Sequence, residues 1–97
     1  MIETLNISLL EDKVFDYLGV DRESIYAGQG VKKVYSARHL LWLLLHDECG
    51  MSHRTISRRY GRTKRMIEKA VSNTRFRVRN QRADMETYEE LKKILVV

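Results

Sequence analysis

Residues 52–71, SHRTISRRYGRTKRMIEKAV, decide the fold. Their apolar or small side chains recur every three or four positions on both sides of residues 60–63, which is the spacing of two short amphipathic helices. Gly61 can adopt the positive φ angle with which many helices end, and the Thr63 hydroxyl can begin the next helix by accepting from the Met66 amide. The stretch therefore predicts a helix-turn-helix, spanning about residues 52–81.

The two predicted helices separate apolar from basic side chains. Helical spacing turns four apolar or small residues inward: Ile56, Tyr60, Ile67 and Ala70. The side chains left outside are basic, namely Arg54, Arg58, Arg59, Arg62, Lys64, Arg65 and Lys69. In DNA-binding proteins with this motif, the start of the second helix meets base edges in the major groove. A plain helical hairpin has the same spacing, so it is the positive charge around the turn that favours DNA binding.

Charge is distributed unevenly along the chain. The 97 residues are enough for one small domain, residues 1–97, with a net charge of +5. Residues 1–30 carry two basic and six acidic side chains, residues 31–82 carry fourteen and three, and residues 83–97 carry two and four. A basic block between acidic ends suits a polyanion held on one face.

Cysteine content and hydropathy indicate the compartment. Cys49 is the single cysteine, so no internal disulfide is possible and a reducing environment is expected. The longest apolar run, residues 40–45, is six residues, whereas a bilayer span needs about 20. The first residues also lack the pattern of a secretory signal. We therefore expect a cytoplasmic protein with no membrane partner.

Four further helices are predicted outside the motif. Their ranges and capping residues are 9–18, begun by a capping box of Ser8 and Glu11; 21–26, capped by Asp21; 37–48, capped by Ser36; and 85–97, capped by Asp84. The Leu-rich helix 37–48 is expected at the centre of the core, with Trp42 buried. No strand pattern is present, so the fold class predicted is all-α, a compact bundle of five to six helices.

Residues 27–35 are predicted to form a loop with two glycines, Gly28 and Gly30, followed by Lys32 and Lys33. A nucleotide-binding loop is not expected, because no strand precedes it and the Walker spacing is absent. Two interpretations remain open. The loop either reaches a phosphate or the minor groove of DNA, or it is a solvated connection between helices.

Several of these features together resemble the C-terminal DNA-binding domain, domain IV, of the bacterial chromosomal replication initiator DnaA. The resemblance rests on Ala37-Arg38 opening a Leu-rich helix, on the pattern S-x-x-x-I-S-x-x-Y-G-R at residues 52–62, and on Ala70. It extends from about residue 9 to the end of the chain. It implies a Trp-repressor-like fold whose motif reads short duplex boxes in the major groove, while a basic loop enters the minor groove.

The resemblance also assigns roles to individual residues. Arg62 matches the signature arginine of the family, after which the family continues Asp-His-Thr-Thr and this chain continues Thr63, Lys64, Arg65 and Met66, so the base-reading residues differ. The predicted base contacts are Arg62, Thr63, Lys64 and Arg65. The predicted phosphate or minor-groove contacts are Lys32, Lys33, Arg38, Ser52, His53, Arg54 and Lys69.

The functional prediction is sequence-preferring binding of double-stranded DNA, in replication initiation or its regulation, with replication proteins as further partners. The alternative is an interaction module of the replication machinery, or a transcriptional regulator, that has lost box recognition. An enzyme is not expected, because no nucleophile with a base partner can be identified and His46 and Cys49 supply only two metal ligands. No cofactor, metal or small-molecule substrate is predicted. The basic block lacks the usual aromatic stacking signature of single-strand binders, which favours duplex DNA.

Overall fold

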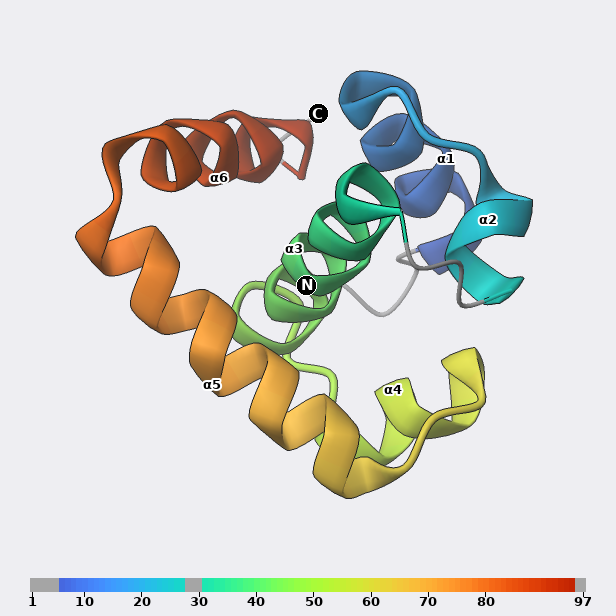
Figure 1. Ribbon diagram of the computed structural model, residues 1–97. Helices are drawn as coiled ribbons and strands as arrows, with labels where there is room; N and C mark the ends of the chain where they lie inside the picture. The colour runs from blue at the N-terminus through green and yellow to red at the C-terminus, as the bar shows by residue number, and fades with distance from the viewer. Residues whose placement is uncertain (1–5, 28–30, 96–97) are drawn as a thin grey trace.

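The computed structural model describes residues 6–27 and 31–95, and within them every regular element is a helix (Figure 1). The six helices are α1 (Ile7–Leu18), α2 (Arg22–Ala27), α3 (Lys32–Asp47), α4 (His53–Tyr60), α5 (Lys64–Asn80) and α6 (Arg82–Ile94). The predicted all-α bundle is therefore confirmed.

Helix α3 forms the centre of the bundle and packs against each of the other five helices. All six residues from Leu40 to Leu45 are buried, although a helix with one apolar face would bury only about half of them. Trp42 is 1 % exposed, which confirms its predicted place in the core. The stretch 40–45 is thus covered on every side, and it is apolar around the whole circumference of the helix.

Helix α5 connects the two ends of the molecule. Figure 1 shows it running diagonally past α3, from α4 at one end to α6 at the other, with α1 and α2 beyond α3. The four residues predicted to face inward from the α4–α5 pair, Ile56, Tyr60, Ile67 and Ala70, are all buried. The junction of α4 and α5 therefore lies at one end of the molecule, away from α6.

The predicted turn between α4 and α5 has the predicted caps. Gly61 ends α4 with φ 66°, and its amide donates to the Ser57 carbonyl. The Thr63 hydroxyl accepts from the Met66 amide at 3.1 Å, and the Ser52 hydroxyl caps α4 by accepting from the Thr55 amide at 3.1 Å. One orphan amide at each of these helix starts gains a partner, which fixes where both helices begin.

Three predicted helix starts are wrong, and the first two are those of α1 and α6. Helix α1 begins before Ser8, because Asn6 is the N-cap and its side-chain oxygen accepts from the Leu9 amide at 3.1 Å. Helix α6 begins before Asp84, because only Gln81 separates α5 from α6 and its amide bonds the Arg77 carbonyl. Both helices therefore begin earlier in the chain than predicted, and the predicted capping residues Ser8 and Asp84 lie inside them.

The largest correction concerns the predicted loop 27–35. Helix α3 begins at Lys32, one turn before Ser36, and Val31 precedes it without a side-chain cap. Val34 packs against the core and Ala37 is buried, so tertiary packing sustains this turn without a cap. Lys32 and Lys33 are thus helical, and the Gly28–Gly30 part of the predicted loop lies outside the described residues.

A buried carboxylate joins α1, α2 and α4. Glu11 is 0 % exposed and accepts from Arg22 at 2.5 Å, from Arg59 at 2.9 Å, from Tyr26 at 2.8 Å and from Tyr60. Burial alone would raise the pKa of Glu11, but hydrogen bonds from Arg59, Tyr60, Tyr26 and Arg22 lower it to about 2. We call these five residues the Glu11 cluster. Glu11 is therefore not a capping-box residue, and Arg59 does not point outward as predicted.

Candidate nucleic-acid interface

The starts of α4 and α5 lie side by side. Glu68, one turn into α5, has a carboxylate oxygen 3.0 Å from Lys64 Nζ and 4.0 Å from His53 Nδ1. Lys64 is the first residue of α5 and His53 the first of α4. Two helix N-termini with their partial positive charge are thus brought to one end of the molecule.

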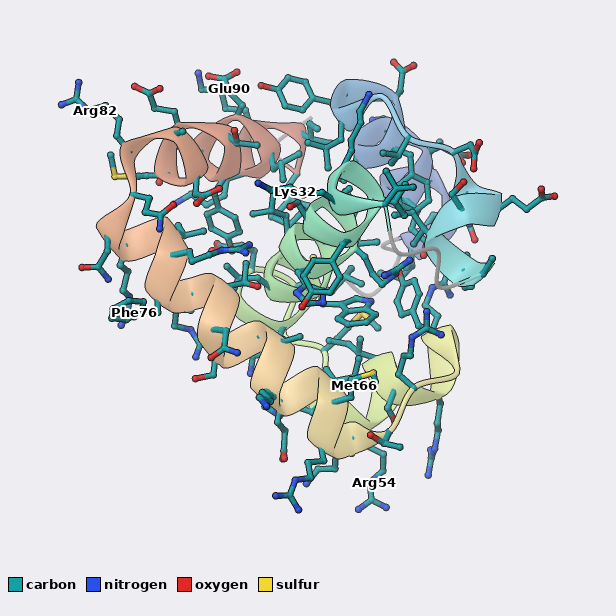
Figure 2. The ribbon with its side chains drawn as sticks, viewed as in Figure 1. Lys32, Arg54, Met66, Phe76, Arg82 and Glu90 are labelled. Carbon is teal, nitrogen blue, oxygen red and sulfur yellow. The ribbon has the colours of Figure 1, made fainter. Side chains whose placement is uncertain are left out.

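Exposed basic side chains surround these two helix starts. We call the following set the basic tip: Arg54, Arg58, Lys64, Arg65 and Lys69, all of them exposed. Figure 2 shows Arg54 pointing away from the body of the molecule at the end where α4 and α5 meet. With the described residues, only Lys64 of this set forms an ion pair, and the other four form no side-chain hydrogen bond. The tip therefore presents cations that folding does not use.

Two of the four predicted base contacts already have intramolecular roles. Arg62 is half-buried and donates from Nη1 to the Tyr60 carbonyl at 3.0 Å. The Thr63 hydroxyl is the cap of α5. Lys64 and Arg65 are the two whose side chains are exposed at the start of the helix.

The predicted backbone contacts Ser52 and His53 lie at the start of α4. The Ser52 hydroxyl is engaged as the cap, and the His53 ring stacks on His46 with centroids 4.0 Å apart. Burial and the neighbouring His46 lower the pKa of His53, while Glu68 opposes them. These shifts favour the neutral imidazole of His53.

The other three predicted contacts lie elsewhere. Arg38 is 5 % exposed and donates to the Ile25 carbonyl at 3.0 Å and the Ser24 carbonyl at 3.3 Å, so it attaches α2 to α3. Lys33 extends over Gly19 at the end of α1. In Figure 2, Lys32 lies in the upper half of the view and Arg54 at its lower end. The structure therefore does not bring Lys32, Lys33 and Arg38 to the basic tip.

One exposed side chain at this end was not singled out from the sequence. Met66 is 50 % exposed, and Figure 2 shows its side chain at the start of α5. Helical spacing could have predicted this exposure, because Met66 lies three residues before Lys69 and three after Thr63, on the outward side of the helix. A thioether there offers an apolar contact beside the cations.

Comparisons with known proteins do not assign the chain to a family. No protein-family model matches the chain, and no curated protein matches it. In the part of the chain that the structure describes, none of the helices has the length and hydropathy to cross a membrane. Within the same residues, no three His, Cys, Asp or Glu side chains are grouped so that they could hold a metal ion.

Proposed function

We propose that this protein binds double-stranded DNA with a sequence preference, through the helix-turn-helix formed by α4 and α5. The observation that carries the proposal is the basic tip: five exposed cations on α4 and the first two turns of α5, four of them with side chains that form no hydrogen bond or ion pair to the described residues. Positive charge of this kind releases counterions from DNA, which is the main source of affinity for duplexes. The two caps fix the helix backbones from which these cations project.

In the proposed complex, the start of α5 enters the major groove. The Arg65 guanidinium is then the group suited to guanine, because it can donate two parallel hydrogen bonds to O6 and N7. Lys64 can make a single contact but must compete with its ion pair to Glu68 at 3.0 Å. Arg54, Arg58 and Lys69 would contact phosphates on either side of the groove, and their role is affinity more than sequence choice.

The start of α4 would face the DNA backbone. Its free amides and helix dipole favour a phosphate there, and Arg54 adds a charge beside them. Arg38 is left out of this interface because it is buried and bonded to carbonyls of α2, and Lys32 and Lys33 because they lie at the start of α3.

The resemblance to the replication initiator supports a finer proposal, a role in replication initiation or its regulation. A cytoplasmic location fits this role and the single cysteine. The second candidate is a protein-interaction module of the replication machinery or a transcriptional regulator, and it is favoured by the altered residues after Arg62.

Selection from a random duplex library, followed by anisotropy at two salt concentrations, tests the proposal. We expect an enriched motif that contains guanine and an affinity that falls steeply with salt. Arg65→Ala should cost about 1 to 3 kcal/mol on the motif and relax the preference at one position. Lys69→Ala should weaken all sequences alike and lower the salt slope by about one.

Lys13→Ala is the matched control, because Lys13 is an exposed lysine on α1, in the acidic part of the chain. It should leave the affinity unchanged. Equal losses for Arg65→Ala and Lys69→Ala on every sequence would contradict base reading by Arg65. No binding of any duplex at low salt would favour the interaction module.

A further inference from the structure

The most exposed large apolar side chain of the described residues is Phe76, on the second half of α5. It is 68 % exposed, whereas the core of the bundle buries its apolar residues almost completely. Figure 2 shows the ring projecting from the outer side of α5, away from the other helices. Within residues 6–27 and 31–95, Phe76 belongs neither to the buried core nor to the apolar side chains packed against it.

The surroundings of Phe76 are polar and basic. Residues three or four positions away share its face of the helix, and Asn73, Arg79 and Asn80 are all exposed. Arg82 is exposed at the start of α6, and in Figure 2 it projects from the same side of the molecule as Phe76. The sequence contains no acidic residue from position 69 to position 83. An exposed aromatic ring therefore stands within the basic block, where the sequence pattern predicted no stacking residue for single strands.

This region is separate from the basic tip. Phe76 lies eleven residues after Arg65, which corresponds to about 16 Å along a helix axis. The major groove is about 12 Å wide, and the first turns of a recognition helix occupy it. The ring is thus placed beyond the part of α5 proposed to read duplex DNA.

The charge around Phe76 selects among possible partners. A symmetric contact with a second copy would bring Arg79 and Arg82 of both chains together, and like charges oppose such an interface. A single-stranded nucleic acid is complementary instead, because its bases offer flat faces for stacking and its phosphates attract arginine. Arg79 and Arg82 form no ion pair or side-chain hydrogen bond with the described residues, so both are available.

We propose that Phe76 and Arg79 form a binding site for single-stranded DNA, in which one unpaired base stacks on the Phe76 ring. The Arg79 guanidinium contacts a phosphate beside that base, and Arg82 contacts the strand further along. The site is independent of base reading by Arg65. It gives the domain a second nucleic-acid surface on the same helix.

The test uses the full chain with a short oligothymidylate and, separately, with duplex DNA. Phe76→Trp should bind the single strand with quenching of the added indole, because stacking brings the base onto the ring; the buried Trp42 supplies a constant background. Phe76→Ala should weaken single-strand binding about fivefold to a hundredfold and leave duplex affinity unchanged. Arg79→Ala should weaken the same binding and lower its salt dependence.

Tyr17→Ala is the matched control, since Tyr17 is an aromatic residue 51 % exposed on α1, in the acidic part of the chain. It should change neither affinity. Unchanged single-strand binding in Phe76→Ala would overturn the proposal, and so would a dimer, seen by sedimentation, that Phe76→Ala abolishes while the single strand is still bound normally. Single-strand binding sensitive to Phe76 in a chain that binds no duplex would support this site and refute only the duplex proposal.

Discussion

The Glu11 cluster and the basic tip both contain arginine, which stabilises the fold in the cluster and stays exposed to solvent in the tip. Arg58 and Arg59 are neighbours on α4, yet Arg58 is exposed and Arg59 donates to the buried Glu11 carboxylate at 2.9 Å. A helix turns about 100° per residue, so adjacent positions face different surroundings. The comparison teaches that an arginine-rich helix can contribute both to folding and to ligand binding, and that the partner of each arginine separates the two roles.

Removing the carboxylate at the centre of the cluster should have the largest effect. Glu11→Ala leaves Arg22, Arg59 and two tyrosine hydroxyls without their common acceptor, and should lower the free energy of unfolding by about 3 to 5 kcal/mol. Denaturant unfolding followed by circular dichroism measures it. Asp12→Ala is the control, because Asp12 also pairs with Arg22 but its side chain is 64 % exposed, and it should cost under about 1 kcal/mol. Equal losses would show that the cluster does not hold the bundle.

Acid should weaken the same cluster without a mutation. The pKa of Glu11 is lowered from 4.5 to about 2 in the folded protein, so the folded state binds its proton more weakly than the unfolded state. This contribution is fully present above about pH 4.5 and is lost as the pH falls toward 2. The shift corresponds to about 3 kcal/mol. Unfolding free energies measured across this range should fall more steeply for the natural chain than for Glu11→Gln, and parallel curves would contradict the assignment.

The sequence predicted the elements better than their limits. The α4–α5 turn was predictable because its caps are local, as Thr63 and Gly61 illustrate. The start of α3 was not, because packing of Val34 and Ala37 extends the helix past Ser36. Glu11 was predicted to be a capping residue. Its actual role could not be predicted, because its four partners lie 11 to 49 residues away in the sequence.

The candidate site was predictable where it depends on local helical register, and not where it depends on contacts between helices. Lys64, Arg65, Lys69 and Arg54 follow from helical register around a capped turn, and the structure brings them to one end. Arg38 and Arg59 are equally basic in sequence, but their roles depend on carbonyl and carboxylate groups of other helices. Basic residues in the sequence are candidates for contacting DNA, and tertiary contacts show which of them are instead used to stabilise the fold.

The smallest and sharpest effect should come from the neighbouring pair on α4. Arg59→Ala removes one charged partner of Glu11 and leaves Arg22 in place, so it should lower the free energy of unfolding by about 2 kcal/mol. Under conditions where this variant is folded, its affinity for DNA should change little. Arg58→Ala removes an exposed cation, so its stability should stay within about 0.5 kcal/mol of the natural chain. Its salt slope for duplex binding should fall by about one. Calorimetry and anisotropy on both variants measure the two quantities, and a loss of affinity in Arg59→Ala larger than that in Arg58→Ala would reverse the division of roles between cluster and tip.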